Sequence, residues 1–393
     1  MIVPTTRAEA LAAAAAVAER ARARARQTEA DRLVPSETIA ELEAAGLFGI
    51  VTPRSLGGAE LGFAALVAVT AELAAACGST GWVYGVLAGH SWLLNLFPIE
   101  AQREVFASPR ALSATVFRLA GKVEAVAGGF RLTDAEGRFC SGVDHAGWVI
   151  VGCPVIGAGS PDPHFFVIPR SEFEIVDDWF TAGMRGTGSR SIRLRECFIP
   201  AHRAVRVQDM ANGTSPGARH HDRPIYRIPF QDVSPFSLVG APLGMAHAAV
   251  RAFAESLKSS VQRMPEDQVS GQAATFARIA RASAEIDAAY ALTIADAERL
   301  DALAAADANS PLARARVLRN WAWAAQTARH AVNQLFEASG GSGIYDSSEL
   351  QRIWRDVNSA AQHFAFTWDS AMNNFGRVLI GLPSSAAVPR GGR

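Results

Sequence analysis

The chain has no excess of either charge and only four cysteines. Both features reduce the number of functional classes to which the protein can belong. Its 393 residues include 38 basic and 38 acidic side chains, so no net field attracts nucleic acid or an anionic membrane. The four cysteines form neither a C-x-x-C pair nor a set with metal-ligand spacing. We expect a cytoplasmic protein with reduced thiols, no metal site and a small-molecule partner.

Targeting and membrane segments are also lacking. The alanine-rich run 11–18 is preceded by Glu9 and followed by Glu19 and Glu29, acids that argue against a secretory signal or a mitochondrial presequence. No apolar window is expected to reach the roughly 20 residues that a membrane span needs. With 49% hydrophobic and 19% charged residues, the composition predicts a soluble globular protein of two or three domains.

Common catalytic motifs are missing as well. The sequence contains no G-x-S-x-G elbow, no Walker A sequence and no H-E-x-x-H. The glycines of 337–345 do not follow a strand pattern, so a Rossmann site fits poorly. His220 and His221 lie in a predicted loop without paired spacing, and we expect both to be exposed to solvent.

The patterns that are present predict an α+β fold that is mostly α. The apolar period is helical at first, changes to two in the middle of the chain, and becomes helical again. The expected parts are an N-terminal helical domain (1–112), a central β-barrel or sandwich (113–205), a loop (206–233) and a C-terminal four-helix bundle (234–393). The bundle helices are predicted at 238–257, 271–306, 310–338 and 350–375. In the first domain, Gly78 should end one helix, and Ser79 or Thr80 should cap the next.

Two predicted helices carry candidate functional histidines. His363 lies at the edge of the apolar stripe of 350–375, where it either faces a pocket or is a hydrogen-bonded interior residue. His90 and Trp92 belong to a helix that is apolar on most sides. They either contact a bound ring or are core residues satisfied by the backbone.

Two turns hold further candidates. Ser141, in the segment 137–152, could donate a hydrogen bond to a ring atom, or it could serve an ordinary hairpin. Arg185 stands in the glycine-bracketed segment 183–200, whose backbone amides could cradle an anion or form a tight turn.

Four motifs, in this order, give a resemblance that spans nearly the whole chain. They are LFGIVTPRSLGGAEL (47–61), RGTGSRSIRLRECFIP (185–200), GGSGIYDSSELQRIWRDV (340–357) and the terminal GRVLIGLP. Together they resemble the acyl-CoA dehydrogenase superfamily. Its dehydrogenases place a glutamate base shortly after an R-D pair, here Arg355 and Asp356. That place falls at about Phe364 and Ala365, so α,β-dehydrogenation would need a base from elsewhere.

The sequence resembles the flavin-dependent monooxygenase branch of this superfamily instead. The features that carry this resemblance are HSW at 90–92, an aromatic-x-Ser-Gly at 139–142 and a histidine after the R-D pair. The branch takes reduced flavin, FMN or FAD, from a separate reductase. With O2 it oxygenates a small aromatic or heterocyclic substrate through a C4a-hydroperoxide. The resemblance also implies a homotetramer.

The branch also implies roles for single residues. Ser141 would hydrogen-bond the flavin near N5, and His363 would lie beside the hydroperoxide and the substrate as a base or an orienting group. His90 would face the same pocket, and Trp92 would help to exclude water from it. A further flavin contact is implied at Phe139, where the family often has tryptophan. Others are implied at Phe117, Arg118, Arg185 and Gly341. Gly341 would meet an FAD tail held by a neighbouring subunit.

Two alternatives stay open at this point. One is a dehydrogenase-like enzyme with tightly bound FAD, which would purify as a yellow protein. The other is a catalytically silent relative that acts as a scaffold or a binding subunit. A colourless protein that binds reduced flavin would favour the monooxygenase.

Overall fold

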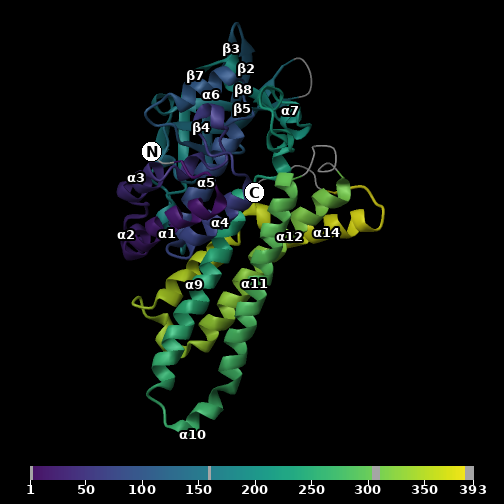
Figure 1. Cartoon of the computed structure of the whole chain (residues 1–393). Coiled ribbons are helices and arrows are strands. Elements are labelled where there is room, and N and C mark those ends of the chain that lie inside the picture. Colours follow the sequence, from purple (N-terminus) through teal and green to yellow (C-terminus); the bar gives the residue numbers. More distant parts are fainter. Residues whose placement is uncertain (1–2, 158–160, 303–309, 386–393) are drawn as a thin grey trace.

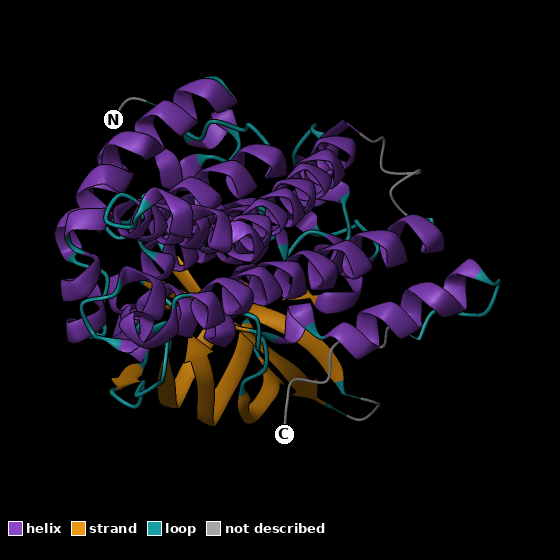
Figure 2. Cartoon of the chain, turned by 90° about the horizontal axis from the view of Figure 1, so that it is seen from below, coloured by secondary structure: helices purple, strands orange, loops and turns teal. Residues whose placement is uncertain are grey.

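The computed structural model describes residues 3–157, 161–302 and 310–385. The chain forms a helical body with a β-sheet at one end, and two long helices extend away from the sheet (Figure 1). Seen from below, the strands gather on one side of the molecule and the helices cover them (Figure 2). This arrangement places one face of the sheet against the helices, where a buried site can form.

The N-terminal part consists of helices. They are α1 (Arg7–Ala23), α2 (Ala25–Asp31), α3 (Ser36–Ala44), α4 (Phe63–Ala74), α5 (Gly78–Leu94) and α6 (Ile99–Phe106), with short 3₁₀ turns at Leu47–Gly49 and Arg54–Leu56. Helix α5 is buried on nearly every side, as its apolar sequence predicts. The expected capping by Ser79 or Thr80 is wrong, because α5 already begins at Gly78 and Cys77 is its N-cap.

The middle of the chain forms one mixed sheet. Its strands are β1 (Ser113–Val116), β2 (Ala120–Val126), β3 (Gly129–Cys140), β4 (Trp148–Ile156), β5 (Asp162–Pro169), β6 (Glu174–Val176), β7 (Arg190–Pro200) and β8 (Ala204–Arg206). The strand order is β6-β7-β3-β2-β4-β5-β8, and β1 pairs with β4 in parallel. The pairing of β3 with β7 shifts register between Gly137 and Cys140, and Phe139 takes a left-handed φ of 64°. This bulge re-aims the side chains at the end of β3, where Ser141 follows.

The predicted loop 206–233 is built from short helical turns instead. They are α7 (Val207–Ala211), α8 (Pro216–His220) and the 3₁₀ turns Pro224–Arg227 and Phe230–Asp232. His220 is exposed, as expected. The expectation for His221 is wrong, because its ring is buried and its Nε2 hydrogen-bonds Oε1 of Gln102 at 2.8 Å. A polar partner on α6 therefore allows an imidazole to be buried.

The C-terminal helices are α9 (Phe236–Val261), α10 (Glu266–Val269), α11 (Ala273–Ala302), α12 (Pro311–Ala338), α13 (Glu349–Ala360) and α14 (Trp368–Leu379). Short 3₁₀ turns lie at Gly340–Ile344 and Phe364–Phe366. By length and hydropathy, the stretch Phe230–Val261 could cross a membrane, contrary to expectation, but 83% of its most apolar window is buried inside the protein. It is therefore placed as a core helix.

The predicted single helix 350–375 is broken. The backbone leaves the helical region at His363, with φ −61° and ψ 137°, and Nδ1 of this residue accepts a hydrogen bond from the backbone N–H of Ala365. The apolar stripe also ends there, since Phe364 and Trp368 are 39% and 42% exposed. His363 consequently lies in a bend between α13 and α14.

Close helix contacts bring α5 and α9 together. A Cβ on Gly85 would lie 2.1 Å from the carbonyl oxygen of Ser237, and one on Gly89 would lie 2.5 Å from Ser237 Cβ. Only glycine permits this approach of α5 to α9. The approach places His90, the next residue on α5, near the start of α9.

Candidate functional site

An apolar cavity lies where α5, the start of α9 and the residues after β1 meet. Its free space is small, about 20 Å³, which is room for about one water molecule, so a ring can enter only when the lining side chains move apart. Its aromatic walls are Phe63, Trp92, Phe117 and Phe230, and its polar groups come from His90, Ser234 and Ser237. No Lys, Arg, Asp or Glu stands among the described residues that line it. An uncharged aromatic ring finds matching walls here, whereas a charged group would lack a counterion.

His90 presents a basic nitrogen to this cavity. Its Nδ1 lies 2.9 Å from the carbonyl oxygen of Ser113, and because a carbonyl can only accept, Nδ1 carries the proton. Among the described residues no hydrogen bond reaches Nε2, so its lone pair is available to a ligand. Burial lowers the pKa of His90 to about 4, and the ring is therefore neutral at pH 7.

Trp92 and Phe230 form a rigid wall of the cavity. Their rings are nearly parallel, with centroids 6.5 Å apart and an interplanar angle of 13°. The indole N–H of Trp92 donates to the carbonyl oxygen of Ile225 at 3.1 Å. Since that N–H is already bonded, Trp92 contributes a surface to the cavity and no free polar group.

Ser141 belongs to a buried cluster of polar groups beside the end of β3. Its Oγ accepts a hydrogen bond from Nε1 of Trp82 at 3.2 Å and lies 2.6 Å from Oγ of Ser189. Oγ of Ser189 in turn lies 2.7 Å from Oγ1 of Thr187. A hydroxyl has one proton and two acceptor positions, so Ser141 can form one further hydrogen bond, as an acceptor if it donates to Ser189 or as a donor if Ser189 donates to it.

His363 lies beside the same indole. Its ring centroid is 5.5 Å from that of Trp82, at an interplanar angle of 68°. Because Nδ1 accepts from the N–H of Ala365, the neutral ring carries its proton on Nε2. Burial lowers the pKa of His363 to about 4. The two site histidines are thus opposite tautomers, since His90 offers an acceptor and His363 offers a donor.

Aromatic contacts connect the cavity to this second cluster. The ring of Phe117 lies 6.3 Å from that of His90 and 6.2 Å from that of Phe364, both edge to face. Phe364 adjoins His363, with ring centroids 4.4 Å apart. A series of packed rings therefore joins the cavity wall to the Trp82–Ser141 pair between the sheet, α5 and the bend before α14.

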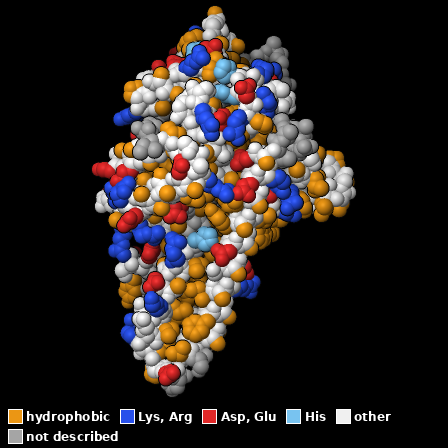
Figure 3. Space-filling model, viewed as in Figure 1, with side chains coloured by type: hydrophobic (Ala, Val, Ile, Leu, Met, Phe, Trp, Pro, Cys, Tyr) orange, Lys and Arg blue, Asp and Glu red, His pale blue; other side chains and the backbone are white. Residues whose placement is uncertain are grey.

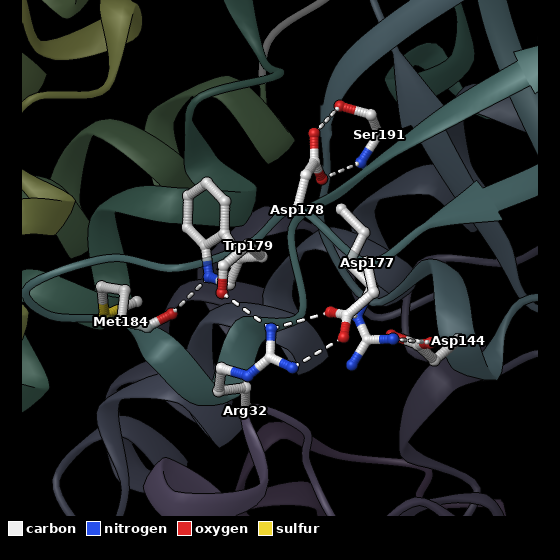
Figure 4. A network of polar contacts seen from close by, with 8 residues as sticks. Arg32, Asp144, Asp177, Asp178, Trp179, Met184 and Ser191 are labelled. Atoms are coloured by element: carbon white, nitrogen blue, oxygen red, sulfur yellow. Dashed lines mark hydrogen bonds and ion pairs between the residues drawn. The ribbon is translucent and has the colours of Figure 1, made fainter.

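A network of ion pairs and hydrogen bonds holds the segment that carries Thr187 and Ser189 (Figure 4). Arg32 bonds both carboxylate oxygens of Asp177 at 2.7 and 2.8 Å, and Asp178 accepts from the backbone N–H and the hydroxyl of Ser191 at 2.9 and 2.6 Å. The indole N–H of Trp179 donates to the carbonyl oxygen of Met184 at 3.0 Å. These contacts fix the turn before β7 in one arrangement.

Comparison with known proteins follows the same division of the chain. The N-terminal domain model of acyl-CoA dehydrogenases matches residues 5–111, and the C-terminal domain model matches residues 237–368. The oxygenase component of the FADH(2)-dependent resorcinol hydroxylase from Rhizobium sp. (strain MTP-10005) is 34% identical over 369 residues, which are 91% of this chain and 90% of that protein. The flavin-dependent monooxygenase oxygenase subunit HsaA of Mycobacterium tuberculosis (strain ATCC 25618 / H37Rv) is 34% identical over 360 residues, 91% of each chain.

This chain belongs to the flavin-dependent monooxygenase branch of the acyl-CoA dehydrogenase superfamily. Solved structures agree. The crystal structure of HsaA from M. tuberculosis superposes with a TM-score of 0.89 at 34% identity, covering 96% of this chain and 98% of that one. XiaF from Streptomyces sp., in complex with FADH2 and glycerol, gives a TM-score of 0.86 at 25% identity and covers 97% of each chain.

The groups around Ser141 suit the cofactor of this monooxygenase branch. Ser141 can form one further hydrogen bond, and no hydrogen bond from the described residues reaches the Nε2–H of His363. Phe139, two residues before Ser141, presents a ring that is 68% exposed. A hydroxyl, an imidazole donor and an aromatic surface together fit a flat heterocycle with an N–H edge, as reduced flavin is.

The other residues that the resemblance implied as flavin contacts do not all lie close to Ser141. Arg118 is exposed, although its neighbour Phe117 lines the cavity. Arg185 begins a tight 3₁₀ turn, and its Nε is buried without a hydrogen-bond partner. Gly341 lies in a turn before α13, whereas His363 follows the other end of that helix, which spans about 18 Å. Within one chain, Gly341 is therefore remote from Ser141.

Sequence reasoning missed Ser189 and Thr187 as members of the site. The segment 183–200 drew attention because of its backbone amides and its arginine. Its hydroxyls are what reach Ser141. The available signal was the run Gly186-Thr187-Gly188-Ser189, in which Gly188 takes a φ of 51° and lets two alternate hydroxyls face the same interior.

Proposed function

We propose that this chain is the oxygenase component of a two-component monooxygenase that hydroxylates an uncharged phenol. The observation that carries the proposal is the lone pair of His90 Nε2 in a cavity without a charged lining residue. A phenol hydroxyl can donate to that nitrogen once Trp92, Phe117 and Phe230 move apart to admit the phenol ring. One oxygen atom of O2 replaces a ring hydrogen, and the other leaves as water.

Reduced flavin, when bound, supplies the activation of O2 and one of the two electron pairs that this reduction needs. The protein does the rest. His90 accepts a hydrogen bond from the phenol hydroxyl and so raises the electron density of the ring carbons ortho and para to the oxygen. His363 holds a proton on Nε2 and can direct it toward the reacting oxygen. Ser141 offers its remaining hydrogen bond to the N5 edge of the flavin, and the aromatic walls exclude water.

The substrate is further limited by charge. Moving a carboxylate into a cavity without a cationic partner costs several kcal/mol, so acidic phenols should be excluded. Ser234 and Ser237, which also line the cavity, suit a second hydroxyl or a carbonyl group on the substrate. The proposed substrates are therefore neutral phenols with an apolar body. They include phenols with a second uncharged polar group.

Partners and assembly extend the proposal. Reduced FMN or FAD would come from a separate flavin reductase in the cytoplasm, where the four buried, unpaired cysteines stay reduced. Apolar side chains gather on the surface over the lower halves of α9 and α11, and Phe276 there is 39% exposed (Figure 3). Helix faces of this kind support a homotetramer, in which Gly341 of one copy would meet an FAD tail held by another.

Reconstitution tests the function directly. The protein would be mixed with a flavin reductase, NADH, flavin and O2, and offered a matched pair of phenols, one with a neutral para substituent and one with a carboxylate of similar size. We expect a dihydroxylated product from the neutral phenol and at least a hundredfold lower kcat/KM for the acid. Oxygen uptake that yields only hydrogen peroxide with every phenol would refute the proposed substrate class.

A further inference from the structure

A short turn at the protein surface forms one side of the cavity beside His90. The walls that come from α4 and α5, which include Phe63 and Trp92, are buried in the core. Phe230 and Ser234 are only half-buried, so the side of the cavity that they form reaches the surface. Because the free space admits about one water molecule, a substrate ring must displace one of these walls.

Phe117 is the other half-buried aromatic wall, but the sheet holds it in place. Strand β1, which ends one residue before Phe117, pairs with β4. Two residues after it, the backbone N–H of Leu119 donates to the carbonyl oxygen of Gly152 at 2.7 Å. The aromatic wall that can move without disturbing the sheet or the core is therefore Phe230, in the 3₁₀ turn Phe230–Asp232, which we call the Phe230 turn.

The Phe230 turn has few polar contacts with the rest of the protein. Within the described chain, the backbone hydrogen bonds of 229–233 close inside this segment or onto the first turn of α9, such as the 2.9 Å bond from the N–H of Asp232 to the carbonyl oxygen of Pro229. Nε of Arg314, in the first turn of α12, lies 2.9 and 2.7 Å from the two carboxylate oxygens of Asp232. Among the described residues, this ion pair is the one polar contact that joins 229–233 to another part of the fold.

The charges of this pair favour a turn that stays closed only while both partners are present. The carboxylate side chain of Asp232 is 4% exposed, and a buried carboxylate that loses its cation is driven toward water. The dipole of α12 disfavours a cation in its first turn, so the position of Arg314 serves the ion pair and not the helix. Oε1 of Gln231 is buried without a hydrogen-bond partner among the described residues, which favours exposure of the turn to water. The ion pair thus acts against a tendency of the turn to open.

We propose that the Phe230 turn is the entrance to the cavity, and that Asp232 and Arg314 are positioning residues that hold this entrance closed. In the closed form the ring of Phe230 lies 5.6 Å from that of Phe117 and nearly parallel to that of Trp92. When the ion pair breaks, the turn moves outward and takes the Phe230 ring from this stack. When the pair forms again, the site closes around the substrate and excludes water. The inference rests on the proposed binding of a neutral phenol in this cavity.

An entrance and a binding wall differ in their kinetics. If the turn controls passage, a weaker ion pair raises the rate constants of phenol entry and phenol exit by the same factor, and the dissociation constant does not change. If the turn only adds contacts to the bound ring, a weaker ion pair raises the rate constant of exit alone. The ratio of the two rate constants therefore tests the proposed role.

Fluorine NMR of 4-fluorophenol, a neutral phenol, measures both rate constants through exchange between free and bound probe. The measurement is made without flavin and with reduced FMN under anaerobic conditions. Arg314→Gln leaves the buried carboxylate of Asp232 without its cation, and Asp232→Asn removes the charge of the carboxylate. We expect each variant to raise both rate constants about tenfold, because a hydrogen bond to a charged group is lost. The double variant should resemble the single ones, since both changes break one contact, and Arg314→Lys should show a smaller effect.

Arg299→Gln is the matched control. The side chain of Arg299 is 37% exposed, as that of Arg314 is, and it pairs with Asp296, which is 1% exposed on α11. Its loss should lower the stability of the bundle without changing phenol entry or exit. Hydrogen exchange measured by mass spectrometry gives a second readout. Exchange of the backbone amides in 228–234 should be about tenfold faster in Arg314→Gln and unchanged in Arg299→Gln.

The outcomes separate failure of the entrance from failure of the proposed function. Unchanged exchange of 228–234 in Arg314→Gln would show that the ion pair does not hold the turn. Faster exchange with unchanged phenol entry would show that phenol enters elsewhere. Either result overturns the inference and leaves the proposed substrate class intact. If 4-fluorophenol binds neither the wild type nor any variant, the neutral phenol has no place in the cavity, and the inference falls with the proposed function.

Discussion

Phe117 of the cavity and Phe364 beside His363 lie edge to face, with ring centroids 6.2 Å apart. Phe117 comes from the end of β1 and Phe364 from the bend before α14, so this one contact joins the sheet to the bundle. It links a wall of the cavity beside His90 to the bend that carries His363. A substrate ring and a flavin can thereby share a dry wall, which the proposed oxygen transfer requires.

Replacing His90 tests its role as the hydrogen-bond acceptor of the phenol hydroxyl. Asn at position 90 can still donate to the carbonyl oxygen of Ser113 but has no lone pair in place of Nε2. We expect His90→Asn to lower kcat/KM for phenol hydroxylation by about 10²- to 10⁴-fold, with flavin affinity unchanged. His90→Gln, whose longer amide can reach the Nε2 position, should recover part of the loss. Equal activity of both variants and the wild type would show that the phenol hydroxyl donates elsewhere.

The pH dependence of phenol binding follows from the same residue. Burial lowers the pKa of His90 to about 4, below its ordinary value, so the ring keeps its lone pair throughout the neutral range. Phenol affinity should therefore be constant from pH 6 to pH 8. It should fall only as the pH drops toward about 4, where protonation removes the acceptor. Equilibrium dialysis of the flavin-free protein would measure this, and a midpoint near pH 6.5 would contradict it.

His363 stabilises the bend before α14 and is also proposed to take part in the chemistry. Two variants separate these roles. His363→Ala removes the acceptor for the N–H of Ala365 and should cost about 1 kcal/mol of unfolding free energy, as loss of a helix cap does. It should also lower the yield of hydroxylated product per flavin oxidised and raise hydrogen peroxide release. His363→Asn keeps a capping oxygen without the Nε2–H, so stability should recover and coupling should not. The exposed His220→Ala is the control.

The glycine at position 89 sets the separation of α5 and α9 at the cavity. In Gly89→Ala the new Cβ would lie 2.5 Å from Ser237 Cβ, so we expect a loss of about 1–3 kcal/mol of stability and a higher KM for bulky phenols. Adding Ser237→Gly should relieve the clash and restore part of the stability. Gly341→Ala, where a Cβ meets nothing within 4 Å, should leave the melting temperature unchanged. An unaltered melting temperature for Gly89→Ala would mean that the helices separate freely.

The periodicity of apolar residues located most helices and strands, because that periodicity depends on the geometry within one element. The alternating runs from Ser113 to Ile199 became strands, and the apolar helices α4 and α5 became core helices. It failed at the bend, where the apolar spacing of 350–375 continues across His363 without a glycine or proline. A histidine is not among the usual capping residues, so its use as an N-cap left no signal in the pattern.

The sequence by itself determined the class of the fold and, through the motifs at 185–200 and 340–357, the superfamily and its cofactor class. It also located His90, Ser141 and His363 as candidates. Only the tertiary structure decided what these residues can do. The partners of Ser141 lie 59 and 48 positions away, and the partner of His90 Nδ1 lies 23 positions away. Which atom holds a proton depends on those partners, because hydrogen-bond direction is set by the neighbour in space and not by the neighbour in sequence.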